Sequence, residues 1–175
     1  MSSIILNGDT SGSVTVSAPS VAGTQTVTLP AASGSLMVSG NMPTFSYGQS
    51  VAVSVANSSF TKITFTSSDW DTTGGMYASS RFTPTVAGYY QINAGIYWTN
   101  ANGCLTTIYK NGSEFKRGQQ VAGLTGQLSA VSGLVYCNGS TDYVEIYGLQ
   151  QFGTSQNTVT GSNITYFQGC LVRSA

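Results

Sequence analysis

The clearest pattern in the chain is the strict alternation of apolar and polar residues over residues 88–98. One side of this stretch carries Tyr90, Ile92, Ala94, Ile96 and Trp98, and the other carries Tyr89, Gln91, Asn93, Gly95 and Tyr97. A β-strand sends successive side chains to opposite faces, so the pattern predicts a strand with one buried face. Its polar face is unusual because it holds two tyrosines.

Similar but shorter patterns lie on both sides of this stretch. Asn111-Gly112 and Asn138-Gly139 are strong signals for tight turns between strands. Strands are predicted around them and elsewhere over residues 51–56, 60–66, 104–110, 114–116, 124–135, 143–149 and 164–172, with polar loops at 67–75 and 150–163. No stretch of useful length has a helical period. The sequence therefore predicts an all-β sandwich or jelly roll.

The first forty residues differ from the rest and predict an extended N-terminal β arm (1–40) ahead of a jelly-roll domain (41–175). Apolar residues group in short runs separated by Gly and Pro: Ile4, Ile5 and Leu6, then Val14 and Val16, then Val27 and Leu29. A lone hairpin of this size is marginal in water, so we expect the arm to gain order by adding to another surface. The alternative is an edge hairpin that packs on its own domain.

Composition narrows the function. Charged residues make up 7% of the chain, the net charge is +0, and six scattered cations do not form the basic patch that nucleic acid needs. The absence of histidine removes Ser–His and Cys–His nucleophile pairs and His-containing zinc sites. We therefore expect no enzyme activity, cofactor, metal site or nucleic-acid partner. No secretory signal or membrane-spanning run is visible, which predicts synthesis in a cytoplasm without membrane insertion.

Three cysteines, Cys104, Cys137 and Cys170, are widely spaced and odd in number. They cannot all pair within one chain, and no CxxC spacing suggests a metal site. Buried free thiols are one interpretation. A single disulfide with one free thiol, or a bridge between subunits, is the other.

Several motifs resemble the C1q-like domain, the trimeric jelly roll shared with the tumour necrosis factor (TNF) superfamily. Phe82, Pro84, Gly88 and Tyr90 are similar to its F-x-x-P-x-x-G-x-Y signature, with Ile92 in the next aromatic position. Residues 132–144 resemble its G-x-V-x-L-x-x-G-D-x-V strand pair, and 167–172 its closing strand. The resemblance covers about three quarters of the chain and implies a homotrimer. The loop at 150–163 lacks the acidic cluster of a family calcium site.

The segment SGSVTVSAPSVAGTQTVTLPAASGSLM, residues 11–37, resembles a stretch near the N-terminus of bacteriophage virion proteins such as fibres and capsid-associated proteins. Together the two resemblances imply a homotrimeric virion structural protein, which would be a capsid decoration, cement or head-fibre protein. The arm would bind the major capsid protein or another virion protein. The alternative is a receptor-binding tail-fibre tip for host attachment, which recognises a host cell-surface glycan or protein.

Two further groups are candidate sites. Tyr89, Tyr97, Tyr143 and Tyr147 lie on polar strand faces and are candidates for the trimer interface, since tyrosine buries a large apolar area and keeps one hydroxyl for a polar partner. Scattered exposed tyrosine is the alternative. Asp69, Trp70 and Asp71 form a possible ligand loop in which Trp70 could stack on a sugar. A solvated turn, with Trp70 packed on the sandwich edge, is the alternative.

Overall fold

The computed structural model describes residues 3–24, 26, 42–123 and 125–175. Within this part of the chain there are strands and no helix, as the sequence predicted. The strands are β1 (Ser3–Asn7), β2 (Ser13–Ser17), β3 (Thr44–Gly48), β4 (Ser54–Val55), β5 (Thr61–Lys62), β6 (Ser67–Asp71), β7 (Tyr77–Ala78), β8 (Arg81–Phe82), β9 (Gly88–Trp98), β10 (Ala101–Lys110), β11 (Ser113–Arg117), β12 (Val121–Gly123), β13 (Gln127–Cys137), β14 (Val144–Leu149), β15 (Gln156–Asn157) and β16 (Tyr166–Ser174).

The chain divides into two compact units, residues 1–35 and 36–175. The first contains the antiparallel hairpin of β1 and β2, and the second contains all other strands. Residues 40 and 41, where the sequence analysis placed the boundary, lie outside the described residues. So do Val27 and Leu29, two of the arm residues proposed for anchoring.

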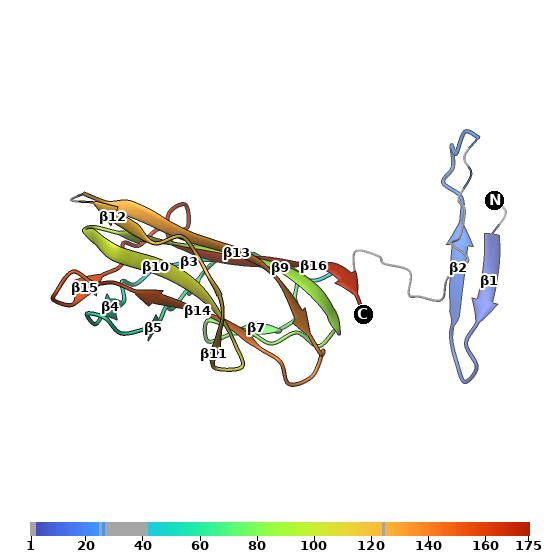
Figure 1. Cartoon of the computed structure of the whole chain (residues 1–175). Helices are drawn as coiled ribbons and strands as arrows, with labels where there is room; N and C mark the ends of the chain where they lie inside the picture. Colours follow the sequence, from blue (N-terminus) through green and yellow to red (C-terminus); the bar gives the residue numbers. More distant parts are fainter. Residues whose placement is uncertain (1–2, 25, 27–41, 124) are drawn as a thin grey trace. The chain divides into compact units, whose positions relative to one another are not determined.

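The second unit is a sandwich of two antiparallel sheets, with β4 and β15 as a separate short pair (Figure 1). The first sheet has five strands in the order β13-β9-β16-β3-β6. The second has the order β11-β10-β14-β8-β7, with β12 beside β10 and β5 beside β14. Strands next to each other in a sheet are often distant in the sequence, which is why local patterns alone do not give this order.

The core lies between the sheets, and β9 supplies much of it. Tyr90, Ile92, Ala94, Ile96 and Trp98 are all fully buried, as the alternation predicted. Phe167 and Leu171 on β16 are also buried, on the same side of that strand. The ring of Phe45 on β3 lies 5.0 Å from that of Phe167 at an interplanar angle of 89°, an edge-to-face packing that aromatic rings favour.

Both predicted Asn-Gly turns join strands. Asn111 and Gly112, between β10 and β11, have φ values of 52° and 78°, as a type I′ hairpin turn requires. Gly139, between β13 and β14, has a φ of 72°, and a Cβ there would lie 2.4 Å from the backbone nitrogen of Ala87. Glycine is therefore needed at 139 for both conformation and space.

Four sequence predictions differ from the structure. The stretch 150–163 was predicted as a loop but contains the short strand β15, which pairs with β4. The polar stretch 67–75 was predicted as a loop, but Ser67–Asp71 is strand β6, paired with β3. Residues 51–56 form a strand only at Ser54–Val55, and 60–66 only at Thr61–Lys62. Hydrogen bonds to β3 hold β6 in a strand although its side chains show no alternation, and Val51 is exposed because no partner strand covers it.

Candidate interaction surface

The outward side of the five-stranded sheet is nearly free of charge. We call it the neutral face. Its side chains, which alternate with the core residues, are Leu128, Ala130, Ser132, Leu134 and Tyr136 of β13; Tyr89, Gln91, Asn93 and Tyr97 of β9; Tyr166, Gln168 and Cys170 of β16; Thr44 of β3; and Trp70 of β6. Arg173 is the one charged residue in β13, β9, β16 and β3, and the edge strand β6 adds Asp69 and Asp71.

Large apolar side chains stand exposed on this face. Leu134 and Trp70 are each 50% exposed, and Leu128, Tyr136 and Tyr89 are exposed to a similar degree. The rings of Tyr89 and Tyr136 pack against each other with centroids 5.4 Å apart. Contiguous apolar patches on a soluble protein commonly mark a binding surface.

Tyr89 and Tyr97, two of the four proposed interface tyrosines, both belong to the neutral face. Tyr89 is exposed, whereas Tyr97 is half-buried because its ring lies against Gly126. Between them, Gly95 leaves room for the ring of Tyr166, which lies across the sheet where a Cβ would stand. The rings of Tyr97 and Tyr166 lie beside Leu128 at the C-terminal end of β9, whereas Tyr89 lies at the other end of the strand.

The outward side of the second sheet has the opposite character. We call it the charged face. It carries three ion pairs: Lys62 with Glu145, Arg81 with Glu145, and Arg117 with Glu114. A fourth, between Lys110 and Asp142, lies at the end of the same sheet. Most of the charge of the chain is therefore concentrated here and neutralised within the chain.

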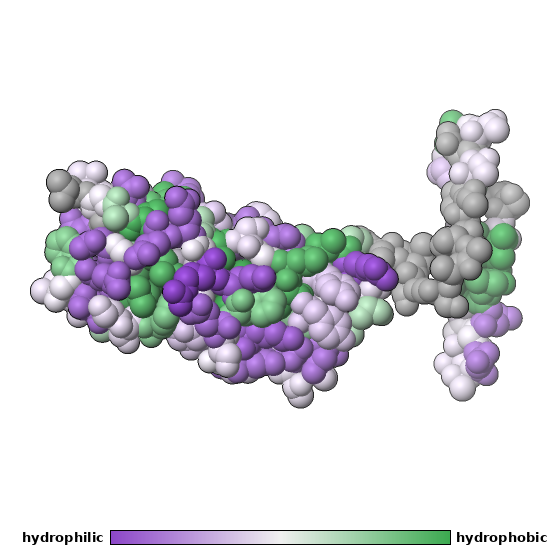
Figure 2. All heavy atoms as spheres, viewed as in Figure 1, coloured by the Kyte–Doolittle hydropathy of each residue, from purple (hydrophilic) through white to green (hydrophobic). Residues whose placement is uncertain are grey.

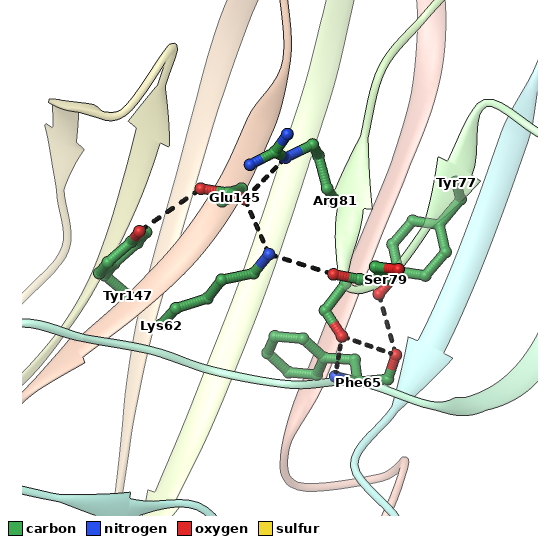
Figure 3. A network of polar contacts seen from close by, with 8 residues as sticks. Lys62, Phe65, Tyr77, Ser79, Arg81, Glu145 and Tyr147 are labelled. Carbon is green, nitrogen blue, oxygen red and sulfur yellow. Dashed lines mark hydrogen bonds and ion pairs between the residues drawn. The ribbon is translucent and has the colours of Figure 1, made fainter.

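Glu145 lies at the centre of a network of polar contacts on this face (Figure 3). Its Oε1 accepts hydrogen bonds from Lys62 Nζ at 2.7 Å and Arg81 Nε at 2.8 Å, and its Oε2 accepts one from the Tyr147 hydroxyl at 3.4 Å. Burial raises the pKa of Glu145, but the hydrogen bonds from the two cations outweigh burial and hold this pKa below its usual value. The network joins β5, β8 and β14.

Of the other two proposed interface tyrosines, Tyr147 lies on β14 of the second sheet and Tyr143 directly precedes that strand. The guanidinium carbon of Arg81 lies 4.0 Å from the ring centre of Tyr143. Tyr147 stacks on Tyr109 with ring centroids 4.0 Å apart. The structure therefore separates the four tyrosines into two pairs on different sheets, and Tyr143 and Tyr147 already have partners within their own chain.

The proposed ligand residues Asp69, Trp70 and Asp71 lie in β6, at the edge of the five-stranded sheet. The carboxylates bond within the sheet: Asp69 accepts from Ser46 Oγ at 2.9 Å, and Asp71 accepts from the Tyr47 hydroxyl at 2.7 Å. Burial raises the pKa of Asp71, but hydrogen bonds from Thr73 and Tyr47 bring it below its usual value. Of these three residues, Trp70 is the one that exposes a large apolar side chain to solvent.

In the arm, the hairpin of β1 and β2 exposes both of its faces. Ile4 pairs with Val16 and Leu6 with Val14, so these four side chains share one face, and Ile5 lies on the other. Their exposed fractions run from 57% to 65%. Figure 2 shows hydrophobic surface along β1 and hydrophilic residues at the turn of the hairpin. The exposed face fits the expected role in anchoring, which no contact in the structure tests.

Cys104, Cys137 and Cys170 are all free; the first two are buried and Cys170 is exposed on the neutral face. Burial raises the pKa of Cys137 to about 11. Among the described residues, no three His, Cys, Asp or Glu side chains group closely enough to hold a metal ion. In the same residues, no helix is long and apolar enough to cross a membrane.

Sequence comparison gives no relative: no protein-family model matches the chain, and no curated protein does. Solved structures do match its fold. Murine APRIL is similar with a TM-score of 0.61 at 10% identity, over 75% of this chain and 100% of that one. The globular domain of zebrafish complement 1qA gives 0.59 at 13% identity, over 77% and 100%. Eiger TNF from S. frugiperda gives 0.57 at 8% identity, over 77% and 93%. The chain thus has the C1q/TNF-like jelly-roll fold that its motifs predicted.

Proposed function

We propose that this chain is a homotrimeric structural protein of a bacteriophage virion, attached through its N-terminal arm as a capsid decoration, cement or head-fibre protein. The neutral face is the observation that carries the proposal. It leaves Leu134, Leu128 and several aromatic rings exposed on a sheet in which β13, β9, β16 and β3 carry a single charged residue. Apolar side chains with a polar surround are typical of surfaces that become buried against another copy.

The exposed arm is evidence for attachment to a virion, whereas the neutral face is evidence for self-association of the jelly roll. Two five-residue strands with both faces exposed form a hairpin that is at best marginally stable alone. Covering the face of Ile4, Leu6, Val14 and Val16 would stabilise it, and the capsid protein or another virion protein would provide that cover. The resemblance of residues 11–37 to segments of virion proteins supports such a partner.

A trimer makes weak anchors effective. Three arms that extend from one assembly bind the same particle at a high effective concentration, so the combined attachment exceeds that of one arm by roughly 10²–10⁴. The function is then mechanical, and no catalytic residue is required.

Sedimentation and docking together test the proposal. The full chain should sediment as a trimer at micromolar concentration and bind particles that lack the protein. Deletion of residues 1–40 should leave the trimer intact and abolish docking. A monomeric full chain contradicts the proposed self-association, and a truncated chain that docks normally contradicts the role of the arm.

A receptor-binding tail-fibre tip is the second candidate, and the half-exposed Trp70 favours it. Binding to host cells or glycans by the jelly-roll domain alone would support this role. Binding to empty capsids by the full chain would support decoration.

A further inference from the structure

A hollow of about 260 Å³ opens on the neutral face beside Trp70. Its walls come from four strands: Trp70 of β6, Thr44 of β3, Gln168 and Cys170 of β16, and Asn93 of β9. Sites for drug-sized ligands have volumes of roughly 300–1,000 Å³, so this one is the size for a single small ring. It lies toward the β6 edge, whereas Leu128, Leu134 and Tyr136 lie on β13 at the other edge of the sheet.

The polar groups of this hollow have hydrogen-bonding capacity left over. Among the described residues, the side-chain amide of Gln168 makes no hydrogen bond. Asn93 Oδ1 accepts from Gln91 Nε2 at 3.2 Å and Ser132 Oγ at 2.8 Å, which leaves its Nδ2 as a donor. The Trp70 ring nitrogen makes only a long contact of 3.5 Å with Thr44 Oγ1. The hollow therefore offers donors and an acceptor to a polar ligand.

The hollow is also uncharged. Every residue that lines it is neutral, and the nearby carboxylates of Asp69 and Asp71 accept hydrogen bonds from Ser46, Tyr47 and Thr73. A charged ligand would lose its hydration without gaining an opposite charge, so the site disfavours ions. An aromatic ring beside two amides instead suits a neutral ligand with one apolar side and several hydroxyl groups.

We infer that this hollow binds one sugar ring of a neutral glycan, with the apolar side of the ring on Trp70 and its hydroxyl groups on Gln168 and Asn93. This goes beyond the structural role proposed above and gives the receptor-binding alternative a specific site. A single small ring with a few hydrogen bonds should bind with a dissociation constant of about 1–10 mM.

The full chain can be titrated with methyl glycosides of glucose, galactose and N-acetylglucosamine while the two tryptophan ring N–H signals are followed by NMR. Trp98 is buried and donates to Ser129 Oγ at 2.9 Å, so its signal serves as an internal control. At least one glycoside should shift the Trp70 signal and leave that of Trp98 in place.

The variants test which side chains hold the sugar. Trp70→Ala should abolish binding, as followed from the glycoside signals, and Gln168→Ala should weaken binding by about 5-fold or more. Phe115→Ala removes an aromatic ring of similar exposure from β11 and should change nothing.

Sedimentation of the same samples separates this inference from the proposed trimer. A trimer that binds a glycoside supports both. A trimer with no Trp70 shift at about 50 mM glycoside overturns the sugar site and leaves the trimer standing. If Trp70→Ala breaks the trimer and no glycoside binds, the hollow belongs to the subunit contact and the inference is wrong.

Discussion

The two sheets of this sandwich bury similar apolar side chains inside but differ in how they use their outward sides. On the charged face, Glu145 has a partner for each oxygen, and Tyr147 and Tyr143 pack on Tyr109 and Arg81. On the neutral face, Leu134, Leu128 and Trp70 have large exposed surfaces. The polar groups of one side thus have partners within the chain, whereas the other side leaves apolar side chains uncovered, which is the basis of the proposed subunit contact. The experiments below test that difference.

The largest effect is expected from a charge on the neutral face. Leu134→Asp should convert the trimer to monomer, because a carboxylate buried at an apolar contact without a partner costs about 3 kcal/mol or more, which is roughly a 100-fold loss of affinity. Sedimentation equilibrium measures this. Phe115→Asp, at a residue of comparable exposure on β11, is the matched control and should stay trimeric. Equal disruption by both variants would mean that the two faces do not differ as proposed.

The next effect concerns the charged face and should appear in stability, not assembly. Glu145→Gln removes the charge that Lys62 and Arg81 share, and should lower the free energy of unfolding by about 1–3 kcal/mol. Glu114→Gln breaks an exposed pair with Arg117 and should cost less than about 0.5 kcal/mol. Urea unfolding of the two variants gives both values. A larger loss for Glu114→Gln would refute the ranking.

A smaller loss of stability is expected at low pH. Because the folded pKa of Glu145 is lowered, the unfolded chain binds more protons and the ion pairs stabilise the fold fully above the ordinary carboxyl pKa of about 4.5. This stabilisation is lost as pH falls through the folded pKa. Asp142 acts in the same direction, since hydrogen bonds from Asn111 and Lys110 lower its pKa. Urea midpoints from pH 7 to pH 3 should fall, and the gap between wild type and Glu145→Gln should narrow. A constant gap would exclude Glu145 as the source.

The smallest effect is a difference in thiol reactivity. Cys104 and Cys137 are buried with raised pKa values, so at pH 8 they should react with a thiol reagent only after unfolding. Cys170 is exposed and lines the hollow beside Trp70, so it should react in the folded chain. Its labelling rate should be similar in wild type and Leu134→Asp, because the hollow lies toward the opposite edge of the sheet from Leu134. A rate that rises about 10-fold in Leu134→Asp would show that assembly covers Cys170.

The sequence predicted those parts of the fold whose cause is local. The alternation of β9 and the Asn111-Gly112 turn are confirmed, since both depend on neighbouring residues alone. Strand β6 was missed because Ser67–Asp71 is exposed along its whole length and its strand conformation comes from hydrogen bonds to β3. An edge strand of this kind carries no hydrophobic period for the sequence to display.

The candidate site was predicted only in part, for a related reason. Alternation showed that Tyr89, Tyr97 and Tyr147 point away from the core, but it does not say which sheet a strand joins. The hollow beside Trp70 needs Gln168 and Asn93, which pair across β16 and β9 although 75 residues separate them. Nothing near either residue in the sequence distinguishes it from an ordinary solvated amide.

The place of β16 in its sheet has a consequence for the order of events in synthesis. This strand follows β3, β6, β9 and β13 in the chain, yet it lies at the centre of their sheet, between β9 and β3. While the ribosome is still adding residues before β16, β9 and β3 each have an unpaired edge. The two halves of the sheet, β13-β9 and β3-β6, therefore join into one continuous face only after β16 has been made.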